Sequence, residues 1–181
     1  MDEKSKMLAG LPYDAWDKQL LQERMRAKQL CHRFNQLQPE QHKVRSKIIS
    51  ELINTKGSVL IEPNFWVDYG YNIFVGKRFY SNHNLTILDC CEVKIGDNVM
   101  CAPNVLISTA THPIDPIERQ TTEYGAPITI GDNVWIGGNA AIMPGVTIGS
   151  GTTIGAGSIV TKDIPSNCVA VGSPCRVIKH L

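Results

Sequence analysis

The spacing of apolar residues divides the chain into two regions. Up to about residue 56, apolar residues recur at helical intervals in two stripes. The first stripe is Trp16, Leu20, Ala27, Leu30, Cys31 and Phe34, and the second is Val44, Ile48, Ile49, Leu52 and Ile53. Asp14 is a candidate N-cap for the first helix, Pro39 suits the start of the second, and Gly57 suits its end. The pattern predicts an N-terminal α-helical hairpin over residues 1–56.

From about residue 58 the apolar period becomes six. Aliphatic residues stand at strict six-residue intervals at Ile130, Ile136, Ile142, Ile148, Ile154 and Val160. Four positions after each comes a small or branched residue, namely Val134, Ala140, Val146, Thr152, Ser158 and Ile164. No amphipathic helix repeats every six residues, and a lone strand alternates every two. The period is typical of a parallel β-helix built from hexapeptides, predicted here over 57–171 with a C-terminal tail at 172–181.

The hexapeptide pattern stops between Ile107 and Ile130. Such an interruption must leave a solenoid as a surface loop, so we predict an extruded loop over 108–129. The loop carries His112, which Pro113 biases toward an extended backbone. Imidazole changes its charge near neutral pH, which makes His112 a candidate general base.

Composition excludes several classes of protein. Lys+Arg 18 against Asp+Glu 17 gives a net charge of +1, without the basic stripe that nucleic-acid binding requires. We expect a cytoplasmic protein, because the sequence shows neither an apolar signal region nor an apolar run long enough for a membrane span. The six cysteines form no C-x-x-C pair and are expected to be reduced, buried thiols.

Several segments resemble the hexapeptide-repeat sugar O-acetyltransferases, the family of the maltose and galactoside enzymes. They are Glu3–Gly10, Asp68–Gly76, Thr111–Arg119, Val134–Gly138, Pro144–Gly149 and Gly155–Pro165. The resemblance implies an all-β core in the form of a left-handed parallel β-helix. It also implies a homotrimer with sites between subunits, acetyl-CoA as cosubstrate and no required metal. The implied reaction is acetyl transfer to a hydroxyl of a maltose-like or glucose-like sugar.

The resemblance also implies roles for individual residues. His112 matches the histidine that removes a proton from the sugar hydroxyl, and the Gly138 N–H matches the donor that faces the thioester oxygen. The residues that match the acceptor side are Asp14, Asp68, Tyr80 and Asn82. Those that match the acetyl-CoA side are Trp135, Gly138, Ala156, Thr161, Lys162, Arg176 and Lys179. Cys90 departs from the galactoside pattern, which has a second acid after Asp89.

Three other readings stay open at this point. A zinc-type hydratase on the same fold needs about three converging imidazoles, whereas the repeat region offers His83 and His112, with His180 at the tail. A ping-pong transferase would use Cys90 or Cys91 as the nucleophile. The third reading is a non-catalytic trimeric scaffold, in which the loop would be dispensable. Within the acetyltransferase reading, the acetyl acceptor could also be an alcohol other than a sugar.

Overall fold

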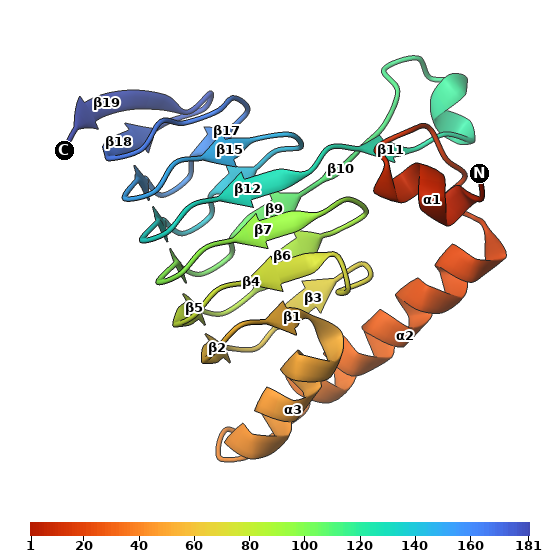
Figure 1. Cartoon of the computed structure of the whole chain (residues 1–181), viewed down its shortest axis with the longest axis horizontal. Coiled ribbons are helices and arrows are strands. Elements are labelled where there is room, and N and C mark those ends of the chain that lie inside the picture. The colour runs from red at the N-terminus through yellow and green to blue at the C-terminus, as the bar shows by residue number, and fades with distance from the viewer.

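The computed structural model describes all residues, 1–181, as a left-handed parallel β-helix with helices at its N-terminal end (Figure 1). The helices are α1 (Glu3–Leu8), α2 (Lys18–Asn35) and α3 (His42–Leu52). Helix α2 packs against strand β3 and against α3, so the hairpin covers the first coils of the solenoid. None of the helices combines the length and the apolar character that crossing a membrane requires.

The strands stack into three parallel faces, which we number in chain order. Face 1 contains β1 (Asn54–Thr55), β4 (Ile73–Val75), β7 (Val93–Ile95), β12 (Ile128–Ile130) and β15 (Thr147–Ile148). Face 2 contains β2 (Val59–Ile61), β5 (Phe79–Ser81), β8 (Met100–Cys101), β13 (Trp135–Ile136), β16 (Thr153–Ile154), β18 (Cys168–Val171) and β19 (Arg176–His180). Face 3 contains β3 (Phe65–Val67), β6 (Leu85–Leu88), β9 (Leu106–Ser108), β14 (Ala141–Ile142) and β17 (Ile159–Val160).

The interior of the solenoid confirms the predicted period. The aliphatic row from Ile130 to Val160 is at most 2% exposed, and the second row, from Val134 to Ile164, is at most 5% exposed. Burying one such aliphatic side chain contributes about 1.5–3 kcal/mol. Because each coil buries its own set against the coils above and below, the repeat forms a continuous core, which residues of α2 and α3 extend to 36 buried residues.

Asparagines hold the edge between face 2 and face 3. Asn84, Asn104 and Asn139 have φ values of 66°, 62° and 58°, the left-handed region that Asn tolerates better than most residues. Their amides form a ladder: Asn84 donates to Asn104 (2.9 Å), which donates to Asn139 (3.1 Å). Asn98 and Asn133 also have positive φ and form a similar pair (3.0 Å) between faces 1 and 2.

Some predicted boundaries differ from the structure. Asp14 is not the N-cap of the first long helix: Asp17 is, and its carboxylate accepts the N–H groups of Gln19 and Leu20. Helix α3 ends at Leu52 rather than Gly57, because the chain enters strand β1 at Asn54 and pairs there with β4. The solenoid therefore begins slightly before the boundary predicted at residue 57.

The extruded loop and the tail are more ordered than predicted. Inside the loop, β10 (Ala110–Thr111) pairs with β11 (Tyr124–Gly125) in antiparallel fashion, and Glu118–Gln120 forms a 3-10 turn. The residues after 172 form β19, which runs antiparallel to β18 at the end of face 2. Local backbone pairing thus replaces the irregular structure expected in both places.

Candidate active site

His112 lies in a pocket of about 390 Å³ at the edge between face 3 and face 1. The pocket is lined by Tyr13, Ala15, Trp16, Arg24, Asp68, Tyr69, His112, Arg119, Gln120 and Glu123. These residues come from the N-terminal segment, α2, the turn after β3 and the extruded loop. The structure thus brings together two of the predicted residues, His112 and Asp68, and Arg24 and Lys28 supply positive charge near the Asp68 carboxylate. A larger groove of about 690 Å³ along α2 shares Asp68 with this pocket but does not include His112.

A buried carboxylate fixes the turn that carries Asp68. Asp89 accepts the backbone N–H groups of Asp68 (3.1 Å), Tyr69 (2.9 Å) and Gly70 (2.7 Å), and Gly70 has the φ of +82° that this tight turn needs. Burial raises the pKa of Asp89 to about 7, against the opposing effect of these N–H donors. Burial also raises the pKa of Asp68, and the nearby Glu123 carboxylate adds to the shift.

Glu123 and Arg24 are pocket residues that the sequence did not single out. Tyr13 and Glu123 exchange both backbone hydrogen bonds (2.9 and 3.1 Å), and the Tyr13 hydroxyl donates to the Glu123 carboxylate (2.8 Å). Arg24 donates to the Tyr69 hydroxyl and to the Ala15 carbonyl. No periodic pattern marks either residue, because their roles depend on contacts between segments far apart in the sequence.

A second group of predicted residues lies on face 2. The pairing register places Tyr80, Met100, Trp135, Thr153, Val169 and Lys179 in one outward row across neighbouring strands. Trp135 and Met100 are 51% and 50% exposed, so this row presents an apolar surface that ends in a positive charge. Three predicted residues, Tyr80, Trp135 and Lys179, therefore share one face.

Three more predicted residues lie along the neighbouring edge, between face 2 and face 3. Gly138 and Ala156 occupy the same position in successive coils, and Asn82 follows β5 lower on this edge. The Gly138 N–H donates to no acceptor within the chain. A Cβ on Gly138 would come no closer than 3.2 Å to another atom, whereas on Gly137 it would lie 2.5 Å from the Ala156 nitrogen. The glycine required by the stacking of coils is thus Gly137, while the half-buried Gly138 keeps an N–H without an acceptor in the chain.

The remaining predicted residues extend the two groups. Thr161 and Lys162 follow β17 at the same edge as His112, two coils away, and Arg176 begins β19 on face 2. Asp14 is exposed next to the pocket and accepts the Trp16 N–H (2.8 Å). Within one chain, face 3 separates the group with His112 from the group on face 2 and its edge, so a single chain does not bring them together.

The cysteines are reduced and buried, as predicted. Cys90 and Cys91 are each 1% exposed and pack beneath the N-terminal segment, where the Cys91 thiol donates to the Met7 carbonyl (3.2 Å). The neighbouring Cys91 thiol and burial raise the pKa of Cys90. The burial of both sulfurs disfavours the ping-pong reading, because a nucleophilic thiol must be accessible to the thioester. No group of three or more His, Cys, Asp or Glu side chains is arranged to hold a metal ion.

Comparison with known proteins decides the family. The maltose acetyltransferase hexapeptide capping motif matches residues 6–57, and the six-repeat bacterial transferase hexapeptide family matches residues 127–162. Galactoside O-acetyltransferase of Escherichia coli is 46% identical over 97% of this chain and 83% of its own length. The chain belongs to the acetyl-CoA-dependent hexapeptide-repeat O-acetyltransferases. This confirms the family and the enzyme class that the sequence predicted.

Solved structures of this acetyltransferase family agree over the whole chain. The maltose O-acetyltransferase of Clostridium difficile 630 has a TM-score of 0.98 and 52% identity, with 100% of this chain and 98% of that chain covered. A galactoside acetyltransferase solved in complex with coenzyme A has a TM-score of 0.95 and 43% identity, covering 99% and 91% of the two chains. The left-handed β-helix with its helical N-terminus is therefore shared by this chain and both relatives.

Proposed function

We propose that this acetyltransferase moves the acetyl group of acetyl-CoA to a hydroxyl of a sugar such as maltose or glucose. The names of the maltose and galactoside relatives support the acceptor class, and the coenzyme A complex supports the donor. The observation that carries the mechanism is the pocket that holds the His112 imidazole together with the Asp68 carboxylate. A base and a hydrogen-bond acceptor for sugar hydroxyls are what direct transfer to an alcohol requires.

The reaction is a direct attack within a ternary complex. The sugar hydroxyl gives its proton to His112 as its oxygen forms a bond to the thioester carbonyl carbon. The oxyanion that develops accepts a hydrogen bond from the free Gly138 N–H. The carbon–sulfur bond then breaks, and the coenzyme A thiolate takes the proton back from the imidazolium. The products are an acetyl ester of the sugar and coenzyme A.

The other predicted residues bind the two substrates in this proposal. Tyr80 and Asn82 join Asp68 and Asp14 around the sugar. Trp135 packs on the pantetheine arm of acetyl-CoA from the apolar row of face 2. The remaining cosubstrate contacts come from Ala156, Thr161, Lys162, Arg176 and Lys179. The basic members of this set, at the C-terminal end, suit the phosphates.

We further propose that the site forms between copies of a homotrimer. The outward row of face 3 is Trp66, Thr86, Leu106, Ala141 and Ile159, and that of face 2 is also largely apolar. The outward row of face 1 is Phe74, Lys94, Thr129 and Thr147, which is mostly polar. If face 3 of one copy packs on face 2 of the next, three copies close a ring and bury both apolar faces. That packing also joins His112 of one copy to Trp135 of another.

The first test measures thiol release from acetyl-CoA with maltose, glucose, a galactoside and a non-sugar alcohol. We expect sugar-dependent release that falls by about 10²-fold or more in His112→Ala, as for the loss of a general base. His42→Ala is the matched control, because His42 is an exposed residue on α3 outside the pocket. Equal turnover by His112→Ala and wild type would refute the mechanism. Release with the non-sugar alcohol alone would refute the acceptor class.

The trimer is tested by mixing two inactive variants. His112→Ala and Asn82→Ala each damage one side of every site in their own homotrimers. In a mixed trimer, a site can form between an Asn82→Ala copy, which still carries His112, and a His112→Ala copy, which still carries Asn82. Such a site contains both residues, so some sites are intact. Co-expression should therefore restore activity that neither variant has alone, in a particle of three 20.0 kDa chains by light scattering. Mixed particles that stay as inactive as their parents would refute sites shared between copies.

A further inference from the structure

An exposed tryptophan stands at the rim of the His112 pocket. Trp16 is 73% exposed, more than Trp135 (51%) or Trp66 (40%), and it lines the pocket together with Asp68 and His112. It lies in residues 13–17, which connect α1 to α2 and which we call the strap. Tryptophan is highly buried on average, and Trp16 combines its exposure with a place in the lining of a polar pocket, which suggests a binding surface.

The strap is rigid although Trp16 is exposed. Asp14 accepts the Trp16 N–H (2.8 Å), and Arg24 of α2 donates to the carbonyl of the preceding residue, Ala15. At one end of the strap, Tyr13 forms its paired backbone hydrogen bonds with Glu123 of the extruded loop. At the other end, the Asp17 carboxylate caps α2. The backbone on both sides of Trp16 is therefore fixed.

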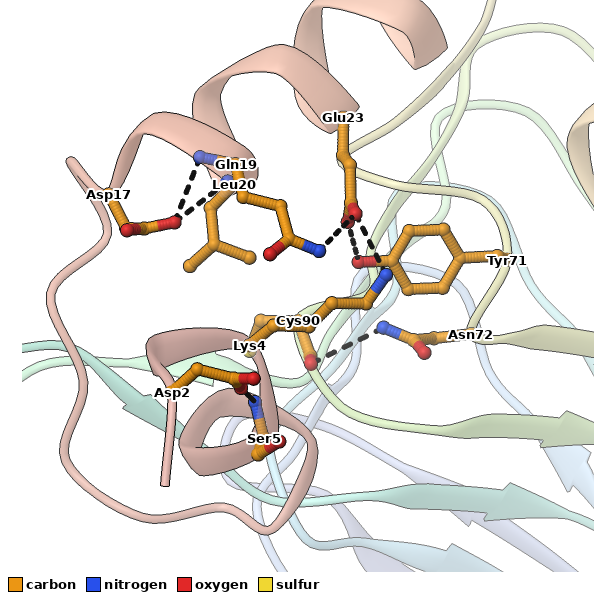
Figure 2. A network of polar contacts seen from close by, with 10 residues as sticks. All are labelled: Asp2, Lys4, Ser5, Asp17, Gln19, Leu20, Glu23, Tyr71, Asn72 and Cys90. Atoms are coloured by element: carbon orange, nitrogen blue, oxygen red, sulfur yellow. Dashed lines mark hydrogen bonds and ion pairs between the residues drawn. The ribbon is translucent and has the colours of Figure 1, made fainter.

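A second network holds the helices that flank the strap (Figure 2). The Glu23 carboxylate accepts hydrogen bonds from Lys4 of α1 (2.8 Å), Gln19 of α2 (2.9 Å) and the Tyr71 hydroxyl (2.6 Å). The Lys4 ammonium also lies 4.4 Å from the centre of the Tyr71 ring. These contacts join α1 and α2 to the solenoid near the pocket. A ligand that meets Trp16 therefore meets a surface that is already in place, which lowers the entropic cost of binding.

The chemistry of the pocket indicates which ligand this surface fits. Around Trp16 the lining carries two carboxylates, Asp68 and Glu123, and two guanidinium groups, Arg24 and Arg119. A pyranose ring has hydroxyls around its edge, which pair with such groups, and a face of C–H bonds, which packs on an aromatic ring. We propose that Trp16 stacks on the apolar face of the acceptor sugar and is a determinant of acceptor specificity. This inference rests on the proposed function, because it assumes a sugar acceptor in this pocket.

Tryptophan fluorescence tests the inference without catalysis. Maltose is titrated into wild type and into Trp16→Phe in the absence of acetyl-CoA. Trp16→Phe keeps Trp66 and Trp135 as emitters, so the comparison isolates the contribution of Trp16. We expect a saturable change in emission in wild type that Trp16→Phe loses.

Steady-state kinetics give the second readout. Trp16→Ala should raise the KM for maltose about tenfold, the effect of losing an aromatic contact of roughly 1.4 kcal/mol. Its kcat and its KM for acetyl-CoA should stay within about twofold of wild type, because Trp16 contacts neither the thioester nor the base in this proposal.

Three outcomes would overturn the role of Trp16. One is an unchanged maltose KM in Trp16→Ala, and another is a maltose-dependent signal that persists in Trp16→Phe. The third is a change of oligomeric state in Trp16→Ala, which would make Trp16 a subunit contact instead. If the wild-type protein released thiol with none of the sugars tested, that result would instead refute the proposed function, and this inference with it.

Discussion

Replacing Gly137 by alanine should destabilise the protein, because the glycine is needed for the coils to stack. A Cβ at Gly137 would lie 2.5 Å from the nitrogen and 2.9 Å from the Cα of Ala156, and 2.8 Å from the carbonyl carbon of Gly155. All three atoms belong to the backbone of the next coil, so no side chain can rotate away. The two coils would have to separate locally by up to about 1 Å to reach ordinary van der Waals distance.

That separation has a cost that can be bounded. The Gly137 N–H donates to the Ile154 carbonyl at 2.8 Å, and opening the edge by about 1 Å breaks this ladder bond. Overpacking costs about 1–3 kcal/mol and a lost hydrogen bond about 0.5–1.5 kcal/mol. Alanine returns about 0.4–1 kcal/mol by restricting the unfolded chain. We expect the free energy of unfolding to fall by about 0.5–4 kcal/mol, with a central value of about 2 kcal/mol.

The assay is urea unfolding followed by circular dichroism, at two protein concentrations because subunit association contributes to apparent stability. Gly138→Ala is the control: the nearest atom to its Cβ would be the Pro103 carbonyl oxygen, at 3.2 Å, and the next would lie at 3.9 Å. Its stability should therefore stay within about 1 kcal/mol of wild type. If Gly137→Ala and Gly138→Ala have the same free energy of unfolding, then the close approach of the next coil does not require glycine at position 137, and the reasoning is refuted.

Three further predictions concern stability alone. The folded-state pKa of Asp89 is about 7 against 3.8 for a free Asp, so the folded state binds the proton more tightly. The free energy of unfolding should therefore fall by about 3 kcal/mol from pH 4 to pH 7, and Asp89→Asn should flatten this dependence. Asn104→Ala should be less stable in thermal melts than Asn104→Gly by about 1 kcal/mol, because both lose the amide ladder but only alanine strains the φ of 62°. Ile142→Ala, in the core, should lower the free energy of unfolding in urea by about 2–5 kcal/mol, whereas Ile114→Ala on the exposed loop should lower it by less than about 0.5 kcal/mol. Equal costs would contradict the assignment of Ile142 to the interior of the solenoid.

The sequence located only part of the candidate site. His112 and Asp68 could be named from motifs, and the structure does place both in one pocket. Glu123, Arg24 and Trp16 also line that pocket, but nothing in their local sequence indicates it. They reach the pocket through hydrogen bonds between α2, the strap and the extruded loop, which no short motif encodes.

What the sequence determined by itself is the solenoid. An inward aliphatic every six residues depends on strand alternation within each short repeat, so it could be predicted without knowing which segments meet. The tertiary structure decided the rest. The asparagine ladder joins residues 20 and 35 positions apart, and face 3 separates His112 from Trp135. Each of these depends on how distant segments pack together, and that is fixed only when the coils stack.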